Sequence, residues 1–329
     1  MTALPVTLRD IQDAQDRIAT QVQRTPMVAD AVLSARLGQP VLLKLEHRQT
    51  TGSFKLRGAT NALLSLTPAV LGRGVVTAST GNHGRALAHA AQRFGVRAVV
   101  CLSHLVAANK VTAIRALGAE VRITGTSQDE AMAEVARCVA QEGLTEVPPF
   151  DDAAVVAGQG TLGLEIVADC PDVALVLVPL SGGGLASGVA AALKVLVPQV
   201  RVIGVTMERG AAMAASLAAG KPVLVQECAS LADSLGGGIG LGNAVTFAMC
   251  RALLDDVILL TETEIAAGMR HAYQLGELIE GAAAVGIGAI LAGKIAASGP
   301  VVAILSGQNI DPDLHARVMA GANGAGELA

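Results

Sequence analysis

The chain has 329 residues, of which 52% are hydrophobic and 16% charged, a composition that supports a large buried core and disfavours intrinsic disorder. The net charge is −4 and the lysines and arginines are not clustered, so nucleic acid is a poor candidate partner. The longest apolar run, residues 281–293, is too short to span a bilayer. No secretory signal is expected at the N-terminus, and the five single cysteines favour a reduced, cytoplasmic protein.

Short apolar runs alternate with longer helical patterns along the chain. A first helix is predicted to begin at Thr7, because its hydroxyl can cap the helix and Asp10 follows three residues later. Strands are predicted at residues 41–45, 74–78, 98–102, 120–124, 175–179, 202–206, 257–261 and 301–305. Helices are predicted between them, for example at residues 84–94, 110–117 and 188–197. Nearly continuous apolar strands are typical of parallel sheets covered on both faces, so an α/β fold is predicted.

A candidate hinge divides the chain. Residues 147–152, with the sequence VPPFDD, combine two prolines with two acidic residues. They would close a smaller unit of residues 74–150. Residues 1–73 and 151–329 would then form the larger domain together.

The first segment with chemical character surrounds Lys55, which is flanked by Phe54, Leu56 and small residues. Desolvation lowers the pKa of an ammonium group, and the neutral amine is the form that makes a Schiff base with an aldehyde. A solvated lysine at a helix start is the alternative, and this segment alone favours it.

The second segment, residues 79–84, stands directly after a predicted strand and before a helix. Its hydroxyl groups, amide and backbone N–H groups could form a carboxylate cradle, and Asn82 could also donate to a phenolate oxygen. An ordinary turn is the alternative. His83 is predicted to be structural, because nothing nearby in the sequence orients it.

The third segment, residues 181–185, reads Ser-Gly-Gly-Gly-Leu and lies between a predicted strand and an Ala-rich helix. Its glycines let the backbone approach a phosphate, and the helix N-terminus supplies N–H groups. The pattern matches neither G-x-G-x-x-G nor the P-loop, which argues against a nucleotide-dependent enzyme. Because these glycines would lie against the phosphate, a side chain placed at Gly183 is expected to enter the phosphate site.

The fourth segment, residues 306–309, follows the last predicted strand. The carboxyl end of a parallel strand is where open α/β sheets present ligand contacts, which makes Ser306 a candidate. A simple turn is the alternative. A second glycine cluster at residues 236–240 could let the backbone pass a flat ring, or could be a flexible loop.

In this order, the four segments resemble the fold-type-II pyridoxal-phosphate enzymes, specifically the serine/threonine dehydratase and serine racemase family. The likeness extends over nearly the whole chain and includes residues 25–26, 118–121 and 157–161. It implies a tryptophan synthase β-like α/β fold with two parallel-sheet domains and helices on both faces. It also implies a pyridoxal 5′-phosphate cofactor, a small amino-acid substrate, a homodimer, and a mobile domain at residues 74–150 that closes over the substrate.

The resemblance also assigns roles to residues. Lys55 is expected to carry the cofactor as a Schiff base and Phe54 to pack beside its ring. Asn82 is expected at the ring's 3-oxygen, Ser306 at the pyridine nitrogen and Glu280 near the ring. The phosphate loop is expected to consist of Gly182, Gly183, Gly184 and Leu185. The substrate carboxylate is expected at Ser79, Thr80, Gly81, Asn82 and His83.

Three departures from the family pattern qualify these expectations. Thr80 stands where racemases place a serine as an acid/base, so racemisation is in doubt. Thr206 and Ala212 occupy the expected positions of metal ligands, so no metal is expected. After Glu280, residues 281–284 read Gly-Ala-Ala-Ala and differ from the family.

The resemblance implies elimination of water from a small β-hydroxy amino acid, with Lys55 removing the Cα proton, to give a 2-oxo acid and ammonia. Residues 79–86, 206–213 and 233–240 look most like the hydroxyectoine-utilisation dehydratases, which indicates a role in hydroxyectoine breakdown. Threonine/serine dehydratase and β-hydroxyaspartate dehydratase are the alternatives, and serine racemase is a further one. A non-catalytic protein that kept the fold is a rival of another class.

Overall fold

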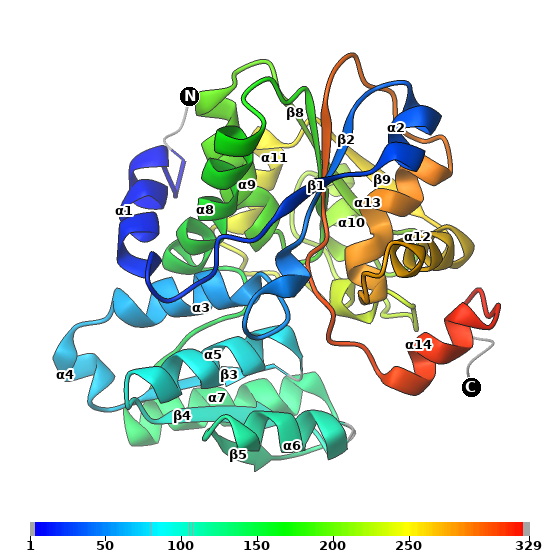
Figure 1. Ribbon diagram of the computed structural model, residues 1–329. Coiled ribbons are helices and arrows are strands. Elements are labelled where there is room, and N and C mark those ends of the chain that lie inside the picture. Colours follow the sequence, from blue (N-terminus) through cyan, green and yellow to red (C-terminus); the bar gives the residue numbers. More distant parts are fainter. Residues whose placement is uncertain (1–3, 80, 105, 107, 325–329) are drawn as a thin grey trace.

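The computed structural model describes residues 4–79, 81–104, 106 and 108–324. Two sheets organise it, each at the centre of a lobe (Figure 1). The larger sheet has the order β1 (Met27–Ala29), β2 (Val41–Lys44), β10 (Val301–Ile304), β7 (Leu175–Pro179), β8 (Arg201–Met207) and β9 (Asp256–Leu260). The smaller sheet has the order β5 (Glu120–Ile123), β4 (Ala98–Leu102), β3 (Val75–Ala78) and β6 (Thr145–Glu146). All neighbouring strands are parallel except β1, which pairs antiparallel with β2.

The helices match the predicted alternation of strand and helix. They are α1 (Leu8–Ile18), α2 (Ala31–Leu37), α3 (Lys55–Leu64), α4 (Pro68–Leu71), α5 (Asn82–Arg93), α6 (Ala108–Ala116), α7 (Gln128–Glu142), α8 (Ala153–Asp169), α9 (Gly184–Leu196), α10 (Ala212–Ala219), α11 (Thr246–Leu253), α12 (Glu262–Gln274), α13 (Gly281–Leu291) and α14 (Pro312–Met319), with short 3-10 turns η1 (Glu46–Arg48) and η2 (Asp233–Leu235). The predicted capping box of α1 is confirmed: the Thr7 hydroxyl accepts from the Asp10 backbone, and the Asp10 carboxylate accepts from the Thr7 backbone. The predicted start of α9 is four residues too late, because the helix begins within the glycine loop itself.

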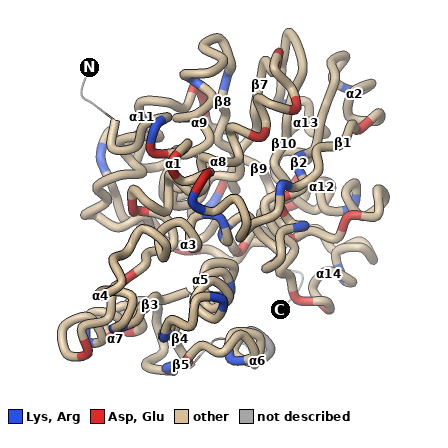
Figure 2. The backbone as a smooth tube through the Cα atoms, turned by 60° about the vertical axis from the view of Figure 1, so that its left-hand side comes forward, with Lys and Arg blue, Asp and Glu red and all other residues tan. Residues whose placement is uncertain are grey.

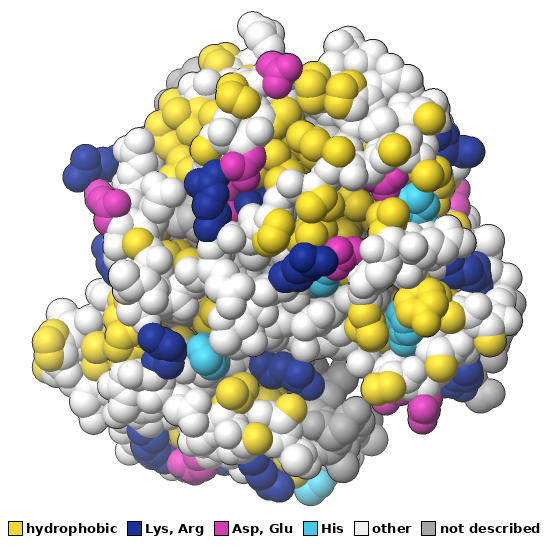
Figure 3. All heavy atoms as spheres, in the orientation of Figure 1, with side chains coloured by type: hydrophobic (Ala, Val, Ile, Leu, Met, Phe, Trp, Pro, Cys, Tyr) yellow, Lys and Arg dark blue, Asp and Glu magenta, His cyan; other side chains and the backbone are white. Residues whose placement is uncertain are grey.

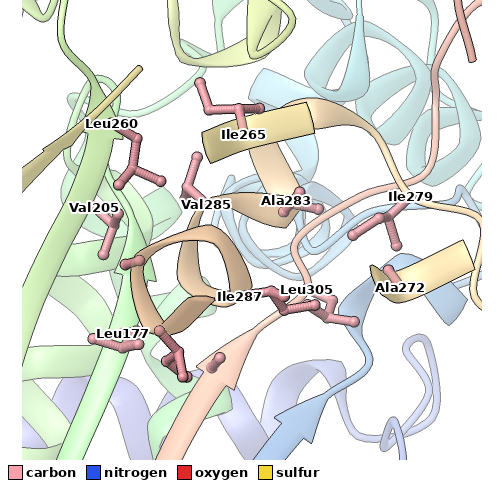
Figure 4. Packing of buried hydrophobic residues seen from close by; sticks show 14 of the residues in the cluster. Leu177, Val205, Leu260, Ile265, Ala272, Ile279, Ala283, Val285, Ile287 and Leu305 are labelled. Atoms are coloured by element: carbon pink, nitrogen blue, oxygen red, sulfur yellow. The ribbon is translucent and has the colours of Figure 1, made fainter. Parts of the chain in front are cut away.

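Helices cover both faces of the larger sheet, which explains its continuous apolar strands. Leu177 and Val205 belong to the core cluster on the α13 side, whereas Val176 and Val202 belong to the cluster on the α9 side. Figure 4 shows Leu177 and Val205 lying next to α13, whose Ile287 is fully buried in the same cluster. The period of two along each strand therefore builds two separate cores.

The smaller sheet is also covered on both faces. Val100 packs in a cluster with Ala86 of α5, and Val99 in a cluster with Val135 of α7. Helix α3 lies between the lobes, where it contacts α5 on one side and α8 on the other. Because Leu56 of α3 is fully buried in the α5 cluster, the core of the smaller lobe extends beyond residues 74–150.

Charged residues of both signs are spread over both lobes (Figure 2). Among the described residues, none of the helices has both the length and the apolar character needed to cross a membrane. The five cysteines are free thiols.

Candidate active site

The chain beyond β10 brings the fourth segment against the residues that precede α3. The backbone N–H of Phe54 donates to the carbonyl oxygen of Ser306 at 3.0 Å, and Ser53 forms an antiparallel bridge with Gly307. Lys55 and Ser306, which are far apart in the sequence, therefore lie at the same edge of the larger sheet. Ser306 is buried, and its hydroxyl makes no hydrogen bond with any described residue.

Lys55 is partly buried, and its amine contacts other residues of the protein. Its Nζ donates a hydrogen bond to the carbonyl oxygen of Pro149 at 2.6 Å and lies 5.2 Å from the centre of the Phe54 ring. Burial lowers the pKa of Lys55 to about 8, against the opposing charge of Glu280. This environment weighs against the alternative of a solvated lysine, and about half of the amine is neutral near pH 8.

Asn82 joins the two lobes at the site. Its Nδ2 donates to Glu280 Oε1 at 2.8 Å, and the Glu280 backbone N–H donates to the carbonyl oxygen of Gly307 at 3.0 Å. Ser234 Oγ donates to the other carboxylate oxygen of Glu280 at 3.3 Å. A Cβ atom at Gly307 would lie 2.5 Å from Glu280 Oε1, so a glycine is needed to let this carboxylate approach.

His83 is buried and uncharged. Its Nε2 lies 2.9 Å from the carbonyl oxygen of Val147. A carbonyl only accepts, so Nε2 carries the proton. Burial and the charge of Lys55 lower the pKa of His83 to about 3. Because Nδ1 is then unprotonated and has no partner among the described residues, His83 has no second N–H to offer a substrate carboxylate. This tautomer supports the expected structural role and weighs against the expected contact with substrate.

Helix α5 begins directly after β3, as the second segment predicts. Gly81 caps this helix without any side-chain hydrogen bond to its first turn, and a Cβ at Gly81 would meet nothing within 4 Å. Ser79 is partly buried beside it. Gly84 allows a close approach, because a Cβ there would lie 2.4 Å from the Ser79 carbonyl oxygen. Thr80 lies outside the described residues.

The glycine loop starts α9, again without a side-chain cap. Gly183 has a φ of 88°, a conformation that favours glycine. A Cβ at Gly183 would lie 2.8 Å from both Cys250 Sγ and Met213 Cε. A side chain at this position would therefore enter the packed interior, and the expectation that it enters a phosphate site is wrong. The Leu185 side chain is buried in the core behind the loop, so only its backbone can face a ligand.

Phe150 connects the glycine loop to Lys55. A Cβ at Gly182 would lie 2.3 Å from the Phe150 ring, and one at Gly184 would lie 3.1 Å from the Phe150 Cα. The preceding residue, Pro149, accepts the hydrogen bond from Lys55. The sequence predicts this segment only as a hinge. Its place between Lys55 and the loop has no local sequence signal.

Comparison with known proteins identifies the same class of enzyme. A family model described as pyridoxal-phosphate dependent enzyme matches residues 18–307. A protein of Sinorhizobium fredii that bears the provisional name threonine dehydratase is 61% identical over 318 residues, which is 96% of each chain. The L-threonine ammonia-lyase of Thermotoga maritima is 40% identical over 316 residues, 95% of this chain and 78% of that protein. The structure of maize serine racemase superposes with a TM-score of 0.90 at 32% identity, covering 96% of this chain and 97% of that one.

Proposed function

The chain belongs to the family of pyridoxal-phosphate dependent enzymes, and on this basis we propose that it removes water from a small β-hydroxy amino acid, releasing a 2-oxo acid and ammonia. The observation that carries the proposal is the partly buried amine of Lys55, which has a lowered pKa and lies between Phe54 and the Pro149 carbonyl.

The residues of the site fit this cofactor. The Lys55 amine has a lowered pKa and can bond to an aldehyde. The uncapped N-terminus of α9 offers backbone N–H groups and a partial positive charge for a phosphate. The buried Ser306 hydroxyl makes no hydrogen bond with the described residues and is available for a ring nitrogen. Glu280 uses only one of the two amide hydrogens of Asn82. The other hydrogen could be donated to the ring oxygen, so Asn82 would hold that oxygen.

When bound, the cofactor supplies a carbonyl for the substrate's amine and an electron sink for the electrons of the Cα–H bond. The protein's own residues then handle the protons. The Lys55 amine, once free of the cofactor, would remove the Cα proton. The β-hydroxyl group would leave as water after taking a proton from the Thr80 hydroxyl or the cofactor's phosphate, and water returns when the released product hydrolyses to the 2-oxo acid and ammonia. The N–H groups at the start of α5 bind the substrate carboxylate. Ser306 is a neutral partner, so it would hold the ring nitrogen without protonating it.

Two substrates have specific support. L-threonine, with L-serine as its smaller analogue, is supported by the names of the relatives from S. fredii and T. maritima. A ring-opened β-hydroxy diamino acid from hydroxyectoine is supported by the likeness of residues 79–86, 206–213 and 233–240 to the hydroxyectoine-utilisation dehydratases. Hydroxyectoine itself has no primary amine and cannot bond to the cofactor.

We further propose that residues 74–150 move as a unit to close the site. The bond between Asn82 and Glu280 joins the two lobes at the site and would form on closure.

A homodimer is also proposed. Hydrophobic side chains gather on the upper lobe in Figure 3, and the exposed Val28 and Val32 of this lobe support an apolar contact. Sedimentation of the purified holoenzyme tests the dimer, and a monomer at micromolar concentration would refute it.

The test of function is a substrate panel on the purified holoenzyme. The release of 2-oxo acid is followed with L-threonine, L-serine, β-hydroxyaspartate and the ring-opened diamino acid, and chiral analysis detects any D-serine formed. We expect elimination from at least one β-hydroxy amino acid and little racemisation. Racemisation faster than elimination on all of them would refute the proposed function.

A further inference from the structure

Asn82 is held at both ends of its amide. Its Oδ1 accepts a hydrogen bond from Asn309 Nδ2 at 2.5 Å, while its Nδ2 donates to Glu280 Oε1 at 2.8 Å. If the amide were flipped, its oxygen would face the Glu280 carboxylate and its NH2 group would face the NH2 group of Asn309. Both contacts would then be repulsive, so the neighbours fix one orientation.

Asn309 is oriented in turn by an arginine. Arg85 Nη1 donates to Asn309 Oδ1 at 2.9 Å. Since a guanidinium only donates, the oxygen of Asn309 must face Arg85 and its nitrogen must face Asn82. The same nitrogen also donates to the carbonyl oxygen of Thr51 at 3.0 Å, which fixes the amide further.

These contacts form one chain of hydrogen bonds with a single direction. It runs from the Arg85 guanidinium through Asn309 and Asn82 to the Glu280 carboxylate. A cation begins the chain and an anion ends it, so each bond polarises the next.

The chain also crosses between the lobes. Arg85 and Asn82 lie three residues apart on the first turn of α5, in the smaller lobe. Asn309 follows β10 and Glu280 precedes α13, both in the larger lobe. Asn309 packs against Gly52, where a Cβ atom would lie 2.9 Å from its Oδ1. The position of Asn309 is therefore set by the larger lobe, and it meets α5 only where the lobes come together.

We propose that Arg85 and Asn309 are positioning residues for the reaction: they fix the direction of the Asn82 amide and hold it against the larger lobe. The inference rests on the proposed function in one respect, namely that Asn82 contacts the cofactor. Neither residue needs to touch the cofactor or the substrate.

The decisive variant is Asn309→Asp. It keeps the size of the side chain and the acceptor for Arg85. It removes the donor to Asn82 Oδ1 and to the Thr51 carbonyl, and it faces both oxygens with a carboxylate. We expect kcat to fall roughly tenfold, the usual scale for losing one or two hydrogen bonds, with KM changed less than threefold. In the absence of any substrate, the absorption maximum of the lysine-bound cofactor, or the pH at which its absorption changes, should shift.

Gln308→Glu is the matched control. Gln308 is exposed and adjacent, so this variant adds the same charge without contact to Asn82; neither kcat nor the absorbance should change. Arg85→Lys should retain more activity than Arg85→Ala, because a lysine can still donate to Asn309. Thermal unfolding of the apo-protein should be the same for Asn309→Asp and the parent within about 2 °C.

A double-mutant comparison decides whether Asn309 acts through Asn82. In an Asn82→Ala background, adding Asn309→Asp should change kcat less than twofold. An equal loss in both backgrounds, or an unchanged cofactor absorbance in Asn309→Asp, would overturn the inference. If the parent eliminates water from no substrate, the proposed function fails, but the substrate-free absorbance still tests the positioning role.

Discussion

The amine of Lys55 and the carbonyl oxygen of Pro149 lie 2.6 Å apart and share a hydrogen bond. This contact ties the first residue of α3 to the segment that leads from the smaller sheet back to α8. The next residue, Phe150, lies against Gly182 and Gly184 of the loop that begins α9. One short segment therefore sets the distance between the lysine and the glycine loop.

The rate at which the apo-protein captures pyridoxal phosphate should rise with pH and then level off, with the midpoint of the rise near pH 8. Only the neutral amine attacks an aldehyde, and burial lowers the pKa of Lys55 to about 8. At pH 7 about a tenth of such an amine is neutral, against roughly 0.03% for a lysine with the usual pKa. Stopped-flow absorbance on the apo-protein between pH 6 and pH 10 measures the midpoint. A rate that keeps rising tenfold per unit through pH 9.5 would show that Lys55 is not desolvated.

The fit between Gly182 and Phe150 should appear as an energetic coupling. Gly182→Ala places a Cβ 2.3 Å from the Phe150 ring, so it should weaken cofactor binding in the parent. In a Phe150→Ala background the space exists, and the same substitution should cost about 1–2 kcal/mol less. Equilibrium cofactor affinities of the parent, the two single variants and the double variant give the coupling. Equal costs in both backgrounds would show that Phe150 does not lie against the loop.

Gly183→Ala should destabilise the fold itself. The positive φ of Gly183 disfavours any side chain, and the new Cβ would lie 2.8 Å from Cys250 Sγ and Met213 Cε. The free energy of unfolding of the apo-protein should fall by about 1–4 kcal/mol. Gly220→Ala is the control, because Gly220 also has a positive φ, of 71°, but a Cβ there would meet nothing within 4 Å. If the two variants lost the same stability in chemical denaturation, the packing behind Gly183 would be excluded as a cause.

Ser306→Ala should lower the elimination rate without releasing the cofactor. The variant removes one neutral hydrogen bond, worth about 0.5–1.5 kcal/mol, so the rate should fall by up to roughly tenfold. The bond from Lys55 and the glycine loop should keep the cofactor bound. Dialysis followed by absorbance measures retention, and 2-oxo acid release measures the rate. Full activity in a variant that keeps its cofactor would remove Ser306 from the site.

The sequence was sufficient to predict the parts of the fold that depend on local patterns. The capping box of Thr7 and Asp10 is confirmed, as is the parallel arrangement of the apolar strands. The three-residue strand β1 and the two-residue strand β6 have no such pattern. They pair only because tertiary packing brings their neighbours alongside.

The candidate site was predictable where a residue type and its place after a strand carry the chemistry, as at Lys55 and Asn82. The contacts among these residues were not predictable from spacing. Asn309 lies 227 residues from Asn82 in the sequence, and its role depends on which way an amide points. His83 was predicted to be structural, but its protonation became clear only from the Val147 carbonyl that it faces.

The central claim is that Lys55 carries the cofactor, and the most direct measurement is reductive trapping. Borohydride reduces the double bond between lysine and cofactor, and mass spectrometry of the digested holoenzyme then locates the added mass. We expect modification of the peptide that contains Lys55 in the parent, and none at any lysine in Lys55→Ala. Modification of Lys44 or Lys110 in the parent, with Lys55 unmodified, would contradict it.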